Sequence, residues 1–287
     1  ILFSHACIAY IHLFESRNKV FDKESVLQET MIVKFKKNTR FPSCITISTS
    51  ATNKDFSDLH KLDVPYQVVV SDNHYYVHLV TDEEEVKSLQ SINHFKNTLV
   101  DLGLKMKTGL VVDFRSRELL RDSEDDSTIP LIYSMHIKDG RVRFPQGKEK
   151  EYIVKDRKGL MQENRNYLFV KRFTAKEERR RLQCGIYLKR YLSSFTYISS
   201  QNKVNFIDGL QGLSECVVYG LYVIFNSTLY DVYYRILNGS TQVNSTEINA
   251  MPVPDMSVIE AMGKQLIAAK NLSVEQCNNI LNHYVNG

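Results

Sequence analysis

The chain has 287 residues, an apolar fraction of 43% and a net charge of only +4. This length suits one large domain or two ordinary ones, and the apolar fraction is sufficient for a packed core. No apolar run approaches the length of a membrane span, and five widely spaced cysteines without a CxxC pair favour reduced cytoplasmic thiols over a zinc site.

The first forty residues predict part of a β-sheet. The opening at 1–14 is mildly apolar, but His5 and His12 interrupt it and no basic leader precedes it, which favours a strand over a signal peptide. Residues 8–14 and 26–35 predict two strands in a hairpin-like arrangement. Because the chain also lacks an initiating Met, we expect it to be a fragment whose true beginning is missing.

More strands and a helix follow. Ile45–Thr49 alternates apolar and hydroxyl residues, as a half-buried strand does. The segments 66–70 and 75–80 predict two strands around a turn at 71–73. Thr81 is then the expected N-cap of a helix whose apolar spacing continues to Leu102.

The segment 108–117 predicts a strand with a basic side. Gly109 allows a close backbone approach, for example to a phosphate. Arg115 and Arg117 fall on the same side by two-residue alternation and suit phosphate or base-edge contacts. An edge strand that only carries surface charge is the alternative.

A hairpin is predicted next. Asp139-Gly140 is a favourable turn that would pair 132–137 with 141–144, with Arg141 and Arg143 on one face.

A strand at 166–173 precedes a capping-box pattern at 174–177, which predicts a helix carrying Arg179, Arg180 and Arg181. A return strand is expected at 201–207. Across 138–190 there are 17 basic and 7 acidic side chains, an excess of 10 that suits a polyanion. A solvated basic face is the alternative.

The C-terminal third predicts helices around one polar loop. Apolar residues recur at helical steps from Gly220 to Leu237, and Asn238-Gly239 provides a helix end through the left-handed conformation that Gly tolerates. A polar run at 240–247 follows, and 256–284 predicts two helices, the second capped by Ser273.

Several stretches resemble adenine-N6 DNA methyltransferases of type II restriction–modification systems. The resemblance covers most of 8–37 and 99–254, and it is strongest at 164–182 and 225–254, which includes Asn226-Ser227-Thr228-Leu229 and Met251-Pro252-Val253-Pro254. It implies that 1–40 is the end of a Rossmann-like, S-adenosylmethionine-binding catalytic domain. It also implies that 41–287 is the DNA target-recognition domain, either of such a methyltransferase or of a fused restriction–methylation enzyme. The expected fold class is α+β, with mixed strands, packed helices and C-terminal helices.

The motifs of methyl transfer are missing. The chain has no Pro-Pro pair for the adenine-binding tetrapeptide and no Gly-rich cofactor loop, so the resemblance assigns S-adenosylmethionine to the parent protein only. We therefore expect no catalytic residue, no bound metal and no methylation by the chain alone. A nuclease with Asp72, Glu85 and Lys87 is a weaker hypothesis, because these acids also suit the first turn of a helix.

The expected partners are double-stranded DNA and the catalytic domain of the same protein, without a membrane, in the bacterial cytoplasm. The predicted DNA-binding residues are those on the basic strands and in the polar loop, namely Thr108, Gly109, Arg115, Arg117, Lys138, Arg141, Arg143, Lys171, Arg172, Asn238, Ser240, Thr241 and Gln242. The alternative function is a separate specificity or interaction subunit, which docks onto a partner methyltransferase through the strand pair at 8–35.

Overall fold

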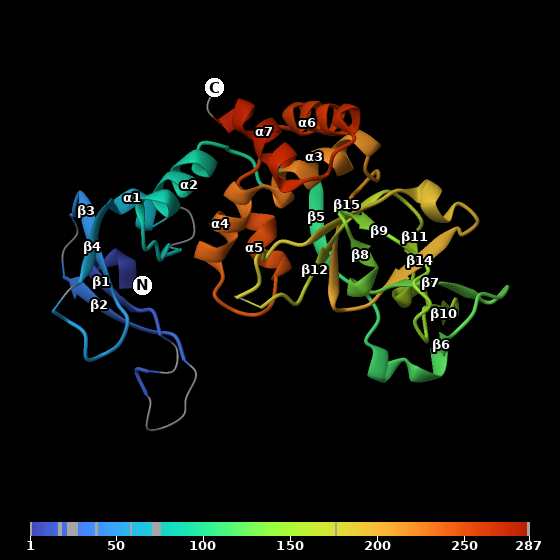
Figure 1. Cartoon of the computed structure of the whole chain (residues 1–287), viewed down its shortest axis with the longest axis horizontal. Coiled ribbons are helices and arrows are strands. Elements are labelled where there is room, and N and C mark those ends of the chain that lie inside the picture. Colours follow the sequence, from blue (N-terminus) through green and yellow to red (C-terminus); the bar gives the residue numbers. More distant parts are fainter. Residues whose placement is uncertain are drawn as a thin grey trace. The chain divides into compact units, whose positions relative to one another are not determined.

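The structure is a computed structural model that describes residues 2–16, 19–21, 28–37, 40–57, 59–70, 76–175 and 177–285. It forms two compact units, Ile1–Gln90 and Ser91–Gly287 (Figure 1).

The first unit is built on a four-stranded sheet with the order β2-β1-β3-β4. Its strands are β1 (Cys7–Phe14), β2 (Thr30–Lys36), β3 (Cys44–Ser50) and β4 (His60–Pro65). A short 3₁₀ helix, Leu2–Ser4, precedes them. β1 pairs with β2 antiparallel and with β3 parallel. The predicted strands at 8–14, 26–35 and 45–49 are thereby confirmed, although residues 26 and 27 lie outside the described residues.

This sheet continues across residue 40. β3 pairs along most of its length with both β1 and β4, so strands before and after residue 40 share one hydrogen-bonded sheet. The boundary predicted at residue 40 therefore passes through a single sheet. As a boundary between functions it stays a prediction.

The strand predicted at Tyr66–Val70 is wrong, because Tyr66–Val69 forms the short helix α1. Tyr66 and Val69 are both buried at three-residue spacing, and Val70 N–H donates to the Tyr66 carbonyl at 2.8 Å. Residues 76–80 form only one bridge, Val77 to Val70, instead of the second predicted strand. The turn predicted at 71–73 and Tyr75 lie outside the described residues.

α2 (Glu83–Asn93) begins near the predicted position but ends nine residues before Leu102. Asp82, not Thr81, caps it: the Asp82 carboxylate accepts from Glu85 N–H at 2.8 Å. The Glu85 carboxylate in turn accepts from Thr81 N–H at 2.6 Å. These two hydrogen bonds resemble a capping box, with the N-cap one residue later than predicted.

The second unit contains two sheets. The six-stranded sheet has the order β5-β15-β12-β13-β9-β8. Its strands are β5 (Leu104–Thr108), β8 (Ile137–Lys138), β9 (Arg141–Val142), β12 (Tyr167–Lys171), β13 (Cys184–Tyr187) and β15 (Val204–Gly209). The five-stranded sheet has the order β11-β14-β7-β10-β6. Its strands are β6 (Leu120–Arg121), β7 (Thr128–Ile132), β10 (Tyr152–Val154), β11 (Gln162–Glu163) and β14 (Tyr197–Ser200).

The core lies between these two sheets. Tyr167 and Phe169 of β12 pack with Phe206 of β15 against Ile132 and Ile198 of the five-stranded sheet. Because side chains alternate along a strand, Leu168 and Val170 point to the other face. α3 contacts that part of the sheet, at β12 and β13.

Among the described residues, five helices follow β15, and α3 and α5 contact strands of the six-stranded sheet (Figure 1). They are α3 (Glu215–Asn226), α4 (Thr228–Leu237), α5 (Ser245–Ala250), α6 (Met256–Ala269) and α7 (Val274–Val285). Short 3₁₀ helices lie at Asp113–Arg115, Arg117–Leu119, Ser134–His136, Lys158–Leu160 and Lys189–Leu192. No helix among the described residues is both long and apolar enough to cross a bilayer. The predicted mixed α+β architecture is confirmed.

The single helix predicted from Gly220 to Leu237 is wrong, because Ser227 divides it into α3 and α4. Ser227 is extended, its hydroxyl donates to the Ile224 carbonyl at 2.7 Å, and it accepts from Tyr230 N–H at 3.3 Å. One serine thus ends the first helix and caps the second. The end at Asn238 is confirmed, but the left-handed conformation predicted at Gly239 is wrong: Asn238 is extended, and Gly239 is not among the glycines with positive φ.

The two C-terminal helices predicted in 256–284 are confirmed as α6 and α7. The Ser273 hydroxyl accepts from Gln276 N–H at 3.2 Å, as the predicted cap requires.

α3 and α6 cross at two glycines. A Cβ on Gly220 would lie 1.9 Å from the Ile259 carbonyl oxygen, and one on Gly263 would lie 1.8 Å from the Cys216 carbonyl oxygen. Both obstacles are backbone atoms, which cannot move aside as a flexible side chain does. The glycines are therefore required by the close approach of the two helix backbones.

Gly220→Ala is expected to destabilise the chain by about 3 kcal/mol, because the overlap outweighs the better helix propensity of alanine. Urea unfolding measures this. Gly159→Ala is the matched control, since nothing lies within 4 Å of its added methyl group. Equal stability of the two variants would contradict the close packing of α3 on α6.

A buried pair, His136 and Glu151, fixes the segment after β9. His136 Nδ1 accepts from Tyr133 N–H at 2.9 Å, so its Nε2–H donates to Glu151 Oε1 at 2.6 Å. Glu151 also accepts from Gln146 N–H and Gly147 N–H, each at 2.9 Å.

Both groups have lowered pKa values. Burial lowers the pKa of His136 below its ordinary 6.5. Burial would raise the pKa of Glu151, but the hydrogen bonds from His136 and the two N–H groups outweigh it and hold that pKa below 4.5.

A lowered folded-state pKa means that the unfolded chain binds the proton first on acidification. The contribution of His136 is therefore complete above pH 6.5 and is lost as the pH falls through its folded-state pKa. His136→Asn should flatten the decline in unfolding free energy below pH 6.5, measured by urea titrations at a series of pH values. His283→Asn, at an exposed position, is the control and should leave the decline unchanged.

Candidate nucleic-acid interface

Three neighbouring strands of the six-stranded sheet have a terminus at the same end of the sheet: β5 and β12 end there, and β15 begins there. Thr108 at the end of β5 pairs with Asn205, and Lys171 at the end of β12 pairs with Val204. The Thr108 hydroxyl donates to Asn205 Oδ1 at 3.2 Å. We call this region, with the turn 201–203 and the loop 238–243 that joins it, the basic sheet end.

Gly109 makes its close approach to backbone. A Cβ there would lie 2.1 Å from the Gln201 carbonyl oxygen, and Gly109 N–H donates to the Val204 carbonyl at 2.9 Å. The absence of a side chain at Gly109 is therefore explained by the turn at 201–203 alone.

The strand predicted at 108–117 is wrong beyond Thr108, where β5 ends. Val111 forms one bridge with Gln201, and Asp113–Arg115 and Arg117–Leu119 are then 3₁₀ turns. Gln201 Nε2 donates to Asp113 Oδ2 at 2.9 Å, which holds the first turn against the 201–203 segment. Because the backbone turns here, two-residue alternation does not apply to Arg115 and Arg117, although both are exposed.

Arg172 joins β12 to two other segments. Its guanidinium donates to the Asn202 carbonyl at 3.1 Å and to Gln242 Oε1 at 3.3 Å. Phe173 bridges antiparallel to Gln242, and Thr174 N–H donates to the Thr241 carbonyl at 3.1 Å. The structure therefore brings the predicted residues Lys171, Arg172, Thr241 and Gln242 together.

The basic helix predicted after Phe173 is wrong, since the described residues from Thr174 to Gln183 contain no helix, and Lys176 lies outside them. The expected cap, Thr174, is buried, and its hydroxyl donates to the Arg181 carbonyl at 3.0 Å. Arg180 donates to the Ser227 carbonyl at 3.0 Å. Contacts of Arg180 and Arg181 with distant segments outweigh the local helix signal, and only Arg179 of the three is exposed.

Arg181 is fully buried and holds the 238–243 loop. Its guanidinium donates to the Asn238 carbonyl at 3.2 Å and to the Ser240 carbonyl at 2.6 Å. Its own N–H donates to Asp231 Oδ1 at 2.8 Å. Burial lowers the pKa of Arg181, and the nearby Asp231 and Glu247 carboxylates oppose this. Nothing in the run of three arginines distinguishes this residue from its exposed neighbour Arg179.

The predicted loop residues differ in role. Asn238 is buried, accepts from Ser240 N–H at 2.7 Å and donates to Glu247, so it shapes the loop from within. Ser240 and Thr241 are exposed and Gln242 is half-buried.

The remaining predicted residues lie at the β8–β9 edge. Arg141 donates to the hydroxyls of Tyr191 at 2.9 Å and Tyr219 at 3.1 Å. Arg143 pairs with Asp139 at 2.9 Å, and Lys138 donates to Gln146 at 2.6 Å. β13 separates this edge from β12, so the predicted residues form two groups and not one continuous strand surface.

The Asp139-Gly140 turn itself is confirmed, with both residues at positive φ. The predicted hairpin around it is shorter than expected: only Ile137–Lys138 and Arg141–Val142 pair. Residues 134–136 form a 3₁₀ helix instead, which the buried His136–Glu151 pair holds.

Three exposed side chains of this region were missed by the sequence analysis: Lys203, Phe114 and Phe173. The 201–207 segment was interpreted as a strand, whereas β15 begins only at Val204. Lys203 therefore lies in a turn, where its side chain is exposed.

The nuclease hypothesis gains no support. Asp72 lies outside the described residues, and the Glu85 carboxylate is occupied by Thr81. Within the described part of the chain, no group of acidic, histidine or cysteine side chains is arranged to hold a metal ion. All five cysteines are free thiols.

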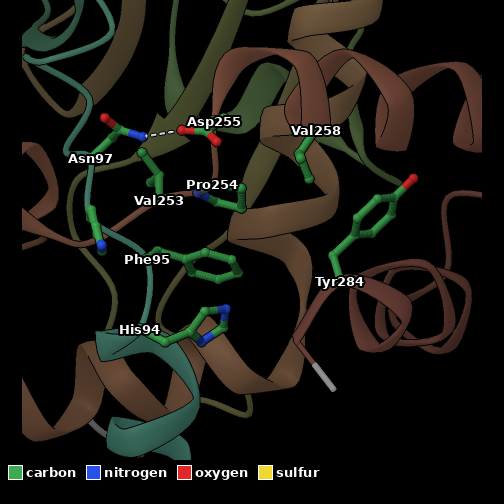
Figure 2. A pocket seen from close by; sticks show the side chains of 9 residues that line it. His94, Phe95, Asn97, Val253, Pro254, Asp255, Val258 and Tyr284 are labelled. Atoms are coloured by element: carbon green, nitrogen blue, oxygen red, sulfur yellow. Dashed lines mark hydrogen bonds between the residues drawn. The ribbon is translucent and has the colours of Figure 1, made fainter. Parts of the chain in front are cut away.

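A separate cavity of about 280 Å³ lies between residues 94–97 and the start of α6. Figure 2 shows the Phe95 ring between Pro254 and the His94 ring, with Tyr284 across from them. Asn97 Nδ2 donates to Asp255 Oδ1 at 2.5 Å and thereby ties the two walls together. None of the predicted DNA-binding residues lines this cavity.

The chain is similar to two bacterial type II methyltransferases. It is 34% identical over 272 residues to M.BsuBI of Bacillus subtilis, covering 93% of this chain and 54% of that protein. It is 33% identical over 263 residues to M.PstI of Providencia stuartii, covering 89% of this chain and 52% of that protein. The chain thus spans about half the length of the curated relatives it matches. These homologues support the predicted resemblance to type II methyltransferases of restriction–modification systems.

No protein-family model matches the chain. Among solved structures, it resembles the type IIL restriction-modification enzyme MmeI in complex with DNA, with a TM-score of 0.51 and 11% identity. That match covers 98% of this chain and 43% of that one. At this identity the likeness concerns the fold alone.

Arg181→Met is expected to destabilise the chain by roughly 2–4 kcal/mol, because buried carbonyls of the 238–243 loop lose their charged donor. Urea unfolding measures the loss, and hydrogen exchange of loop amides should accelerate more than exchange in α6. Arg179→Met, at the exposed neighbour, is the control and should change neither quantity. An unaltered loop in Arg181→Met would show that Arg181 does not hold it.

Proposed function

We propose that Ser91–Gly287 is the target-recognition region of an S-adenosylmethionine-dependent adenine-N6 DNA methyltransferase of a restriction–modification system, and that it binds double-stranded DNA. The observation that carries this proposal is the basic sheet end. There Lys171, Arg172 and Lys203 lie beside the polar loop that Arg181 holds. The homologous type II methyltransferases and the resemblance at 164–182 and 225–254 support it.

The basic sheet end suits DNA for an electrostatic reason. Lysine and arginine displace condensed counterions from phosphates and fix the register of the protein on the duplex, whereas neutral polar side chains discriminate between base edges. Exposed Ser240 and Thr241, together with half-buried Gln242, provide such neutral groups next to the cations. Arg115 and Arg117 add exposed charge, and Arg141, Arg143 and Lys138 form a second basic group. Asn238 and Gly109 are proposed to shape the surface without contacting DNA.

The chemistry is assigned to another part of the parent protein. The sequence has neither the Pro-Pro pair nor the Gly-rich loop that adenine methylation uses, so we propose that cofactor and catalytic residues belong to that other part. The sheet of the first unit is then the end of the catalytic domain. Because that sheet includes β3 and β4, the functional boundary is proposed nearer to residue 90 than to residue 40. DNA methylation takes place in the bacterial cytoplasm, which is the proposed location.

The exposed edge strand of the first unit is suited to docking onto the rest of that catalytic domain. Within the described part of the first unit, β2 pairs only with β1, and it exposes Met31, Ile32 and Phe35. Unpaired strand edges with apolar side chains readily take up a further strand. The same observation supports the second candidate, an interaction subunit that docks onto a separate methyltransferase. Its discriminating test is whether the parent reading frame encodes the adenine-binding motif.

Lys171→Glu and Lys203→Glu should each weaken binding of a fluorescein-labelled DNA duplex about tenfold at moderate salt and reduce the slope of log affinity against log salt by about one or more. Fluorescence anisotropy titrations over a range of salt concentrations provide both quantities. The reason is that each reversal removes one phosphate contact and adds repulsion.

Lys264→Glu on the exposed face of α6 is the matched control, with the same change in net charge. If Lys264→Glu weakens binding as much as the other two, only net charge matters and the basic sheet end is not the interface. If the unaltered chain shows no salt-dependent binding, the proposed function itself is wrong.

A further inference from the structure

Two exposed phenylalanines of the second unit each lie next to an arginine. Phe173 is 45% exposed, and the Arg172 guanidinium lies 5.5 Å from the centre of its ring. Phe114 is 65% exposed, and the Arg115 guanidinium lies 5.4 Å from the centre of its ring. A single exposed apolar residue is ordinary in any protein, but these two are held by hydrogen bonds of the surrounding backbone.

The backbone beneath Phe173 is fixed from both sides. Val243 N–H donates to the Arg172 carbonyl at 2.7 Å, and Thr174 N–H donates to the Thr241 carbonyl at 3.1 Å. The next residue, Thr174, is buried and hydrogen-bonded to Arg181. A ring on such a support stays at the surface, and the backbone that carries it loses little conformational freedom when a partner covers the ring.

Both pairs are connected to one turn. Arg172 donates to the Asn202 carbonyl at 3.1 Å. On the other side, Asn202 N–H donates to the Val111 carbonyl at 2.8 Å, and Gln201 Nε2 donates to Asp113 at 2.9 Å. The segments that carry Phe114 and Phe173 are therefore both hydrogen-bonded to residues 201–202, next to exposed Lys203.

An aromatic ring beside a cation is the combination that binds bases. A planar base stacks on the ring, the guanidinium favours the neighbouring phosphate, and such stacking is largely independent of sequence. A duplex offers its base faces only where its stack is opened. Modification of an adenine amine requires that opening, because the reacting base must leave the stack. Apolar side chains that enter the resulting gap offset part of the cost of unstacking.

We propose that Phe114 and Phe173 stack on bases exposed where the bound duplex opens, each assisted by its neighbouring arginine. This inference rests on the proposed DNA-binding function and assigns it a further task. The basic side chains bind phosphates of any duplex, whereas the two rings bind only DNA whose stack is interrupted.

The test compares two probes with the full chain: a fluorescein-labelled duplex, and the same duplex with one central mismatched pair, which opens at lower cost. The chain should bind the mismatched duplex more tightly. Phe173→Ala and Phe114→Ala should reduce that preference by about tenfold or abolish it, while the salt dependence of binding stays unchanged. Phe173→Leu keeps most of the apolar surface but no ring, and it should behave like Phe173→Ala.

Leu210→Ala is the matched control. Leu210 is 91% exposed and follows the opposite end of β15, so its loss removes exposed apolar surface away from the turn at 201–203. The proposal is overturned if the unaltered chain binds both duplexes equally, or if both alanine variants keep the preference. It is also overturned if Phe173→Leu retains the preference, since apolar contact and not stacking would then be responsible. If salt-dependent binding persists in any of these three cases, the proposed DNA-binding function is not contradicted.

Discussion

The burial of one charged side chain controls the shape of the candidate interface. Arg181 has no exposed surface, and a guanidinium without partners in such a position would be strongly unfavourable. It is stabilised by the carbonyls of Asn238 and Ser240, and the adjoining backbone is held by Asp231. The loop at 238–243 therefore has its conformation because it satisfies Arg181. In turn it provides the backbone partners for Phe173 and Thr174 at the end of β12.

The sheet provides the second constraint. Antiparallel pairing of β12 and β5 with β15 brings Lys171, Thr108 and the turn at 201–203 to one end of the sheet, although these residues are far apart along the chain. Gly109 permits this arrangement, because any side chain there would overlap the Gln201 carbonyl. The cations and the polar loop of the proposed DNA interface are thus consequences of strand register, and they do not depend on a basic helix.

Local patterns were reliable where one strong signal acted alone. The strands at 8–14 and 166–173, the Asp139-Gly140 turn and the Ser273 cap all formed as predicted, because alternation, turn chemistry and capping act within a few residues. They failed where a distant partner competed. Thr174 has the sequence of a helix cap, yet its hydroxyl binds Arg181, and the arginines that would extend that helix reach the carbonyls of Ser227 and Ser240 instead.

The sequence by itself determined the mixed α+β class, the excess of positive charge in 138–190, the absence of methyl-transfer motifs and the resemblance to type II methyltransferases. Only the tertiary structure decided which basic side chains of the chain are exposed. Arg181 is buried, and Arg141 is hydrogen-bonded to two tyrosine hydroxyls. Lys203, which the sequence did not distinguish, is exposed beside Arg172. The physical reason is that the charge of a side chain is a property of the residue alone, whereas its exposure depends on which distant segments pack around it.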